Sequence, residues 1–346
     1  MFPKRYHHLD VYKGVCMLLI ILTHFRWNVA ERLKYFFPFW VDMAVPVLMV
    51  ITGYLYALSF QKKEMSLKVS YQISELIIKW LRFVIPYFPV LFAEMCARKF
   101  ILHENITVVS VLQSFVVGGY GPGSYYFPVM LQVVVLLPII IVSIRKYRFR
   151  GLVLWFSINV LFEIVKTLIG MGDAIYRLLS LRYLFVLSYG VFLYYSFNRN
   201  NVFLYKDSVK QKLELIFAVG GATGLIYLAS FNYFGFKPII TAMWTNTSVF
   251  AVLWIVPLTY WLFLKVDVKN ELLEIFGQAS FEIFLVQKVY YWGLVRYVYK
   301  LIDNSFLQLM LGLIISLVFG VVYYKIENPI QKKVVSWVKE VNCSRL

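Results

Sequence analysis

Hydrophobic stretches long enough to cross a membrane recur along the whole 346-residue chain. A helix of about 20 apolar residues spans the hydrocarbon core of a bilayer, which is roughly 30 Å thick. The hydrophobic fraction of 61% and the mean hydropathy of +0.70 both exceed those of a soluble domain. Because lipid offers a backbone no hydrogen-bond partner, each stretch must satisfy its own amides as a helix. The sequence therefore predicts an all-α fold, a polytopic transmembrane helical bundle.

The chain contains ten predicted spans and one shorter apolar segment. The segment 104–118 is too short to be a full span and leads into the glycine-rich GGYGPGS, which predicts an interfacial or re-entrant piece. Residues 1–346 are expected to form one integral membrane domain, because no long linker or polar domain interrupts them. The predicted spans cover residues 11–27, 39–60, 80–99, 124–144, 151–170, 178–197, 213–232, 243–264, 276–297 and 305–324.

The formal net charge of +17 is distributed as membrane topology requires. If the N-terminus is inside, the cytoplasmic connections and the C-terminal tail hold most of the lysine and arginine, which predicts that both termini are inside. Basic residues concentrated in the cytoplasmic connections indicate contact with anionic lipid. We therefore expect no nucleic-acid partner. The residues concerned are Lys62, Lys63, Lys68, Lys79, Arg82, Arg145, Lys146, Arg148, Arg150, Arg199, Lys206, Lys210, Lys212, Lys332, Lys333, Lys339 and Arg345.

The three cysteines predict neither disulfides nor a metal site. Cys16 and Cys96 fall within predicted spans, and Cys343 lies in the predicted cytoplasmic tail. This arrangement provides no disulfide framework and no spacing typical of metal ligands, so no metal is expected. The first apolar stretch lacks a small-residue cleavage site, and we expect it to be a span rather than a cleaved signal peptide.

Two ionisable residues share one face of the first predicted span. Lys13 and His24 are eleven residues apart, which at about 100° per residue is within roughly 20° of three full turns, with a rise on the order of 16 Å. Ionisable groups at membrane depth are costly and mark functional sites. With Asp10 they predict a polar path into the bilayer. An interfacial histidine and a structural Asp10–Lys13 ion pair are the alternatives.

Asp42 is the candidate partner of His24. It lies near the predicted outer end of the second span, and a hairpin of the first two spans would bring it close to the histidine. A carboxylate beside an imidazole fixes its tautomer and raises its basicity. The alternative is an exposed acidic residue in a loop.

Two other segments have side chains that suit ligands. Lys79 and Arg82 are three residues apart at the cytoplasmic end of the third span, a pair that fits phosphate groups or lipid headgroups equally well. The glycine-rich loop 118–123 is flanked by tyrosines, whose faces and hydroxyls suit a sugar. An aromatic belt at the membrane interface explains the same tyrosines.

The remaining charged residues within the spans divide into structural and functional candidates. Glu163 and Lys166 are one turn apart and predict a structural pair. Arg182 enters the sixth span from the outer side, and Glu282 has no local partner, which makes it a candidate for lining a cavity. Glu327 precedes Pro329, which is a signal for the end of a helix.

Several segments together resemble the membrane-bound acyltransferase-3 family over nearly the whole chain and in the family's order. The first corresponds to the family's first helix, in which a basic residue and a histidine follow a Leu-Asp pair. The second ends in a Ser/Thr-Gly-aromatic-Leu pattern, and the last contains the closing Glu-x-Pro motif. The segments are LDVYKGVCMLLIILTH, VDMAVPVLMVITGYLY, KWLRFVIPY, FGQASFEIFLVQ and YKIENPI.

The chain departs from the family pattern at two positions. The family arginine is Lys13 here, as in the branch related to fucose-4-O-acetylases, so the charge is kept but the planar fork is lost. The family's late histidine is Gln287, which cannot act as an acid or base. The resemblance therefore places the catalytic role on His24.

The family resemblance implies an integral membrane O-acyltransferase of the bacterial plasma membrane. It would move an acetyl group from cytoplasmic acetyl-CoA to a hydroxyl of a surface or capsular polysaccharide, or of its lipid-linked precursor. His24 would act as general base and Asp42 would orient it, with an acetyl-histidine intermediate as the alternative. Acetyl-CoA would contact Lys13, Lys79 and Arg82. The expected substrate-binding residues are Arg182 and Glu282.

A transporter or flippase of a lipid-linked sugar or small anion is the main alternative function. Ten helices with an intramembrane charged path would serve it as well. Transporters often show two similar halves with matching broken helices, and the sequence contains no such internal repeat. The sequence favours the enzyme for this reason.

Overall fold

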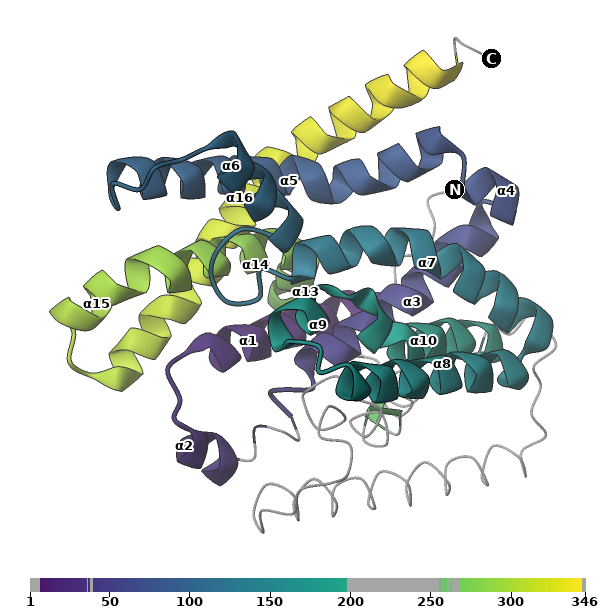
Figure 1. The fold of residues 1–346 in the computed structure, drawn as a ribbon, viewed down its shortest axis with the longest axis horizontal. Helices are drawn as coiled ribbons and strands as arrows, with labels where there is room; N and C mark the ends of the chain where they lie inside the picture. Colours follow the sequence, from purple (N-terminus) through teal and green to yellow (C-terminus); the bar gives the residue numbers. More distant parts are fainter. Residues whose placement is uncertain are drawn as a thin grey trace. The chain divides into compact units, whose positions relative to one another are not determined.

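The computed structural model describes residues 7–35, 37, 40–197 and 268–343, with a few isolated positions between 255 and 262. Every element assigned within these residues is a helix (Figure 1), which confirms the all-α class. The predicted span 213–232 lies outside the described residues, as does nearly all of 243–264.

Five of the described helices are long and apolar enough to cross a membrane. This finding agrees with a membrane protein, whereas the count of ten spans and the inside position of both termini stay predictions. The five helices are α3 (Ala44–Lys62), α5 (Ile73–Phe100), α7 (Tyr126–Tyr147), α8 (Phe149–Leu168) and α16 (Ser305–Cys343).

Shorter helices make up the rest of the described structure. α6 (Val108–Val117) has ten residues and is about 15 Å long, half of a hydrocarbon core, as expected for a piece that does not span. Thr107 and Ser110 form a capping box at its start, and Gly118 ends it in a left-handed conformation. The others are α1 (His7–His24), α2 (Val29–Lys34), α4 (Leu67–Ser70), α9 (Asp173–Leu178), η2 (Ser180–Tyr183), α10 (Leu184–Phe197), α13 (Glu271–Gln278), α14 (Ser280–Val289), η4 (Tyr290–Leu294) and α15 (Val295–Leu301).

The last helix, α16, continues past the proline that was expected to end it. The helix runs through Pro329 to Cys343, so the predicted end near Pro329 is wrong. A proline removes one backbone hydrogen bond, and the carbonyl that it leaves without a partner belongs to Lys325. Because Lys325 is exposed, a solvent molecule or lipid headgroup can satisfy that carbonyl.

The chain divides into two compact units, each built from segments distant in the sequence. The first contains Met1–Phe25, Lys68–Val135 and Asn270–Leu346, and the second contains Arg26–Leu67 and Leu136–Lys269. The expectation of one membrane domain over 1–346 stays a prediction.

In the first unit, α1 packs along α13 at glycine positions. A Cβ atom on Gly14 would lie 2.2 Å from the carbonyl oxygen of Leu273, and one on Gly277 would lie 1.8 Å from that of Asp10. No side chain fits at either position, so the two backbones lie in direct contact, as at many helix contacts in membranes. This contact fixes α1, which carries Lys13, against the C-terminal part of the unit.

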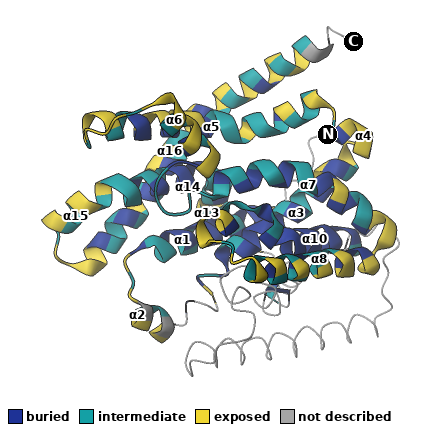
Figure 2. Cartoon of the chain, viewed as in Figure 1, coloured by how far each residue is buried: buried dark blue, intermediate teal, exposed yellow. Residues whose placement is uncertain are grey.

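In the second unit, α3 and α10 pack closely, again through glycines. A Cβ atom on Gly53 would lie 2.2 Å from the carbonyl oxygen of Leu187, and one on Gly190 would lie 2.0 Å from that of Val50. α10 is buried along nearly its whole length (Figure 2), and Asn159 of α8 accepts a hydrogen bond from the Phe185 amide near its start. α10 is therefore the central helix of this unit.

Candidate functional site

His24 is the last residue of α1, and two other segments of the first unit approach its imidazole. The Tyr291 ring lies 6.2 Å from the imidazole, centroid to centroid, in an edge-on arrangement. Gly123 approaches from the glycine-rich loop, and a Cβ atom built on it would lie 3.5 Å from His24 Nε2. The histidine is only partly buried. Part of its surface therefore stays accessible beside Tyr291 and the glycine-rich loop.

Tyr291 reaches His24 from a short π-helix, η4, which follows α14 directly. A π-helix shifts the side chains after it relative to an α-helix, and such turns occur often at functional sites. The Tyr291 hydroxyl donates a hydrogen bond of 3.4 Å to the Ile21 carbonyl, which holds its ring against the end of α1. No periodicity in the sequence signals a π-turn, so the sequence pattern does not point to Tyr291.

The glycine-rich loop between α6 and α7 packs too tightly to hold side chains at its glycines. Gly119, Gly121 and Gly123 have φ values of +81°, +94° and +81°, in the left-handed region that side chains disfavour. A Cβ atom on Gly121 would lie 2.7 Å from the Lys288 carbonyl oxygen, and one on Gly123 would lie 2.7 Å from the Phe284 ring. The loop backbone therefore lies directly on α14, next to His24.

A fully buried ion pair lies beneath this loop. Lys288 Nζ is 2.9 Å from Glu94 Oε1, and neither side chain has any exposed surface. Lys288 donates a hydrogen bond of 2.9 Å to the Gly118 carbonyl, and the other oxygen of Glu94 accepts one of 3.2 Å from the Tyr120 amide. The pair joins α5, α14 and the loop, and no local sequence pattern indicates it, because the two residues lie far apart in the chain.

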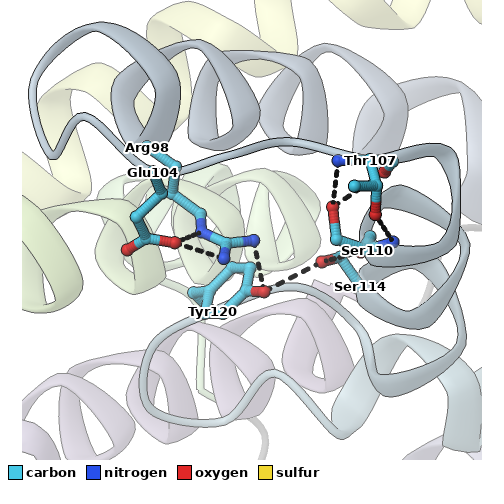
Figure 3. Close-up of polar contacts among 6 residues, drawn as sticks. All are labelled: Arg98, Glu104, Thr107, Ser110, Ser114 and Tyr120. Atoms are coloured by element: carbon cyan, nitrogen blue, oxygen red, sulfur yellow. Dashed lines mark hydrogen bonds and ion pairs between the residues drawn. The ribbon is translucent and has the colours of Figure 1, made fainter.

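A second set of contacts holds the loop from the side of α6 (Figure 3). Arg98 forms an ion pair with Glu104 and donates a hydrogen bond to the Tyr120 hydroxyl, whose ring lies 4.3 Å from the guanidinium carbon. The Ser114 hydroxyl donates a hydrogen bond of 3.1 Å to the same oxygen. Tyr120 is thus held at its hydroxyl by α5 and α6 and at its amide by Glu94.

Lys13 lies about three helical turns before His24 on α1, in a cluster of charged residues. Its ammonium forms a 2.7 Å ion pair with Asp10, the structural alternative raised by the sequence. Glu282 of α14 is buried and interacts electrostatically with both Lys13 and Glu327. The structure therefore brings the predicted donor residue Lys13 and the predicted substrate residue Glu282 together, with Glu327 as a third member.

Arg82 lies close to the same cluster through α16. Gln331 donates hydrogen bonds to Glu327, at 3.2 Å, and to the Arg82 carbonyl, at 3.1 Å. The Arg82 side chain is exposed, and Lys79 lies one turn before it on α5. The first unit therefore contains all three basic residues, Lys13, Lys79 and Arg82. Contacts through Glu327 of α16 connect α5 with α14.

The family model described as an acyltransferase domain matches residues 6–325. The chain belongs to the acyltransferase-3 family. The match includes His24, Lys13, the glycine-rich loop and α14, and it makes this chain a membrane acyltransferase. The branch related to fucose-4-O-acetylases stays a prediction. No curated protein and no solved structure is similar enough to match.

Two of the predicted site residues of this acyltransferase belong to the second unit. Asp42 accepts a 2.6 Å hydrogen bond from Arg32, and burial raises the pKa of its carboxyl while Arg32 opposes the rise. Arg182 is buried with its guanidinium carbon 4.6 Å from the Tyr183 ring, and it interacts electrostatically with Glu163. Because His24 belongs to the first unit, the orientation of His24 by Asp42 and the binding of substrate by Arg182 stay predictions.

The predicted pair of α8 differs from expectation. Glu163 accepts a hydrogen bond of 2.7 Å from the Tyr176 hydroxyl and interacts electrostatically with Lys166, whose ammonium forms its ion pair with Asp173 at 3.5 Å. Among the residues that the structure describes, no three histidine, cysteine or acidic side chains gather as metal ligands would.

Proposed function

We propose that this acyltransferase moves an acetyl group from cytoplasmic acetyl-CoA to a hydroxyl of a surface or capsular polysaccharide or of its lipid-linked precursor. The observation that carries the proposal is the position of His24, partly exposed at the end of α1 and lined by Gly123 and Tyr291. A histidine at the rim of a packed site suits proton transfer with a substrate, because an imidazole can both accept and donate a proton.

The basic residues of the first unit support a polyanionic donor such as acetyl-CoA. Lys13 lies about 16 Å along α1 from His24, and Arg82 is connected to its cluster through Gln331 and Glu327. Ammonium and guanidinium groups both suit phosphate groups. This spacing fits a donor whose phosphates lie at one end and whose thioester reaches toward the histidine.

The aromatic side chains near His24 support a sugar acceptor. The rings of Tyr120 and Trp292 lie 5.9 Å apart, and Trp292 borders Gly121 of the loop. Tyr291 adds an aromatic ring next to the proposed base, and Tyr120 and Trp292 add rings along the glycine-rich loop. Sugars present both CH faces and hydroxyls, and these side chains complement both.

In the proposed reaction the neutral imidazole of His24 accepts the proton of the acceptor hydroxyl. The hydroxyl oxygen attacks the thioester carbonyl and forms the new C–O bond. The tetrahedral intermediate collapses, the C–S bond breaks, and the CoA thiolate takes the proton from the imidazolium. The products are an acetyl ester and free CoA, and His24 returns to its starting state.

The test compares His24→Gln and His24→Ala with wild type in membranes supplied with labelled acetyl-CoA and the polysaccharide of the host cell. Loss of a general base typically costs about 10²- to 10⁴-fold in rate, so acetylation should become undetectable while the protein still accumulates. His103→Asn is the matched control, since His103 is an exposed residue of the α5–α6 connection. Proton NMR of the polysaccharide provides the acetyl signal.

Wild-type acetylation in both His24 variants would refute the proposed mechanism. Movement of a sugar across the membrane without formation of an acetyl ester would favour the transporter instead.

A further inference from the structure

The buried Lys288–Glu94 pair is difficult to explain by stability alone. Removal of two charges from water costs several kcal/mol per ion, and replacement of such a pair by apolar residues is often neutral or stabilising. Both side chains have 0% exposed surface. A pair of this kind contributes little net stability, so its contacts should show what else it does.

Both members of the pair also form hydrogen bonds with the backbone of the glycine-rich loop. Lys288 donates to the Gly118 carbonyl, and Glu94 accepts from the Tyr120 amide. Gly119 lies between these two contacts, and a Cβ atom on it would lie 2.3 Å from Glu94 Oε2 and 2.7 Å from Lys288 Nζ. The ion pair therefore holds the first half of the loop on both sides of Gly119.

The second half of the loop reaches His24. Pro122 stiffens the short connection from Gly121 to Gly123, because its ring restricts the backbone. Gly123 then lies against Phe284 and next to His24 Nε2. Because only three residues separate Gly119 from Gly123, and Pro122 is one of them, we expect a displacement at Gly119 to be transmitted to Gly123. The position of the loop backbone beside the imidazole therefore depends on the ion pair.

We propose that Lys288 and Glu94 are positioning residues for acyl transfer, which hold the glycine-rich loop against His24 so that the acetyl group and the acceptor hydroxyl meet the imidazole in one geometry. The inference rests on the proposed function, in which His24 is the base. Small displacements in an active site cost large factors in rate, because reacting atoms must lie within about 3–3.5 Å. The pair acts through the loop and does not itself touch the substrate.

The test uses the full-length enzyme in detergent and the double variant E94Q/K288M. The double variant removes both charges at similar volume, whereas a single change leaves an uncompensated charge and destabilises the fold by about 3–5 kcal/mol. We measure acetyl transfer per folded molecule and the amide hydrogen exchange of residues 118–125. The control is K166M/D173N, which removes an ion pair of the second unit in which Asp173 is 71% exposed.

In the double variant we expect kcat to fall at least tenfold, the KM for acetyl-CoA to stay unchanged, and exchange in residues 118–125 to become faster. The control should match wild type in all three. If the double variant does not accumulate, E94M/K288M replaces it with the same expectations, because it also removes both charges together and in addition removes the acceptor of the Tyr120 amide.

A wild-type kcat in the folded variant, or unchanged exchange in residues 118–125, would overturn the inference. A fall in kcat that only follows the folded fraction would overturn it as well, because that result shows a structural role. If the wild-type enzyme transfers no acetyl group, the proposed function fails instead, and the exchange measurement alone decides whether the pair holds the loop.

Discussion

Gly119→Ala should destabilise the protein much more than Gly170→Ala, although both glycines have positive φ. Gly119 has φ of +81° and lies against the Lys288–Glu94 pair, where a Cβ atom would be 2.3 Å from Glu94 Oε2. Gly170 has φ of +62°, and nothing lies within 4 Å of its Cβ position. The two substitutions add the same methyl group to similar backbones, so their difference isolates the contact with the ion pair.

The expected magnitudes follow from these distances. An alanine in the left-handed region costs about 1–2 kcal/mol at either position. At Gly119 the methyl group also pushes the carboxylate away, since a contact of 2.3 Å is far shorter than van der Waals separation. Loss of a buried ion-pair partner costs about 3–5 kcal/mol. Gly119→Ala should therefore lower the free energy of unfolding by about 4–7 kcal/mol, several times the cost of Gly170→Ala.

The assay is thermal unfolding of both purified variants in detergent, followed by tryptophan fluorescence, with acetyl transfer measured on the folded fraction. The decrease in Tm caused by Gly119→Ala should be several times the decrease caused by Gly170→Ala, and Gly119→Ala should slow acetyl transfer. Equal Tm shifts would show that the carboxylate moves aside without cost, and the assignment of the loop contact to the buried pair would then be wrong.

Three further predictions concern topology, the donor and the second unit. Reporter fusions after residue 120 should map outside and those after residue 148 inside, and the reverse pattern would contradict the inside position of the N-terminus. The double variant Lys79→Ala, Arg82→Ala should weaken acetyl-CoA binding without loss of membrane insertion, whereas normal affinity would assign both residues to lipid contact. Asp42→Asn should reduce acetylation less than His24→Ala does, because the proposed role of Asp42 is only to orient the histidine. A loss as large as that of His24→Ala would contradict this role of Asp42.

Local features of the sequence predicted a considerable part of the structure. Gly53 lies inside a long apolar helix, where a residue without a side chain indicates a close helix contact, and its Cβ position lies 2.2 Å from the Leu187 carbonyl oxygen. The short segment 104–118 contains the ten-residue helix α6, which is too short to span. The Asp10–Lys13 pair, three residues apart, is present at 2.7 Å. Each of these follows from helix period, length or residue size, which act within a few turns.

Two other expectations differ from the structure, one because of additional partners and one because of exposure. Lys166 lies one turn from Glu163, yet its ion pair is with Asp173 from the start of α9, while Glu163 is bonded to Tyr176. Pro329 was expected to end the last helix, but a proline leaves only one carbonyl without a partner, and an exposed position tolerates this. A local pattern indicates what a residue can contact, and packing selects among the available partners.

The sequence by itself determined the helical class, the membrane environment and the candidate base His24 with Lys13 on the same face. Only the tertiary structure revealed that Lys288 reaches a loop 170 residues earlier in the chain, and that Glu94 meets it there without any exposed surface. It also placed Tyr291 against His24 through a π-turn. Helix periodicity is a property of neighbouring residues, whereas contacts between helices depend on how whole faces pack. The residues that position the loop beside His24 therefore came from the fold and not from the sequence pattern.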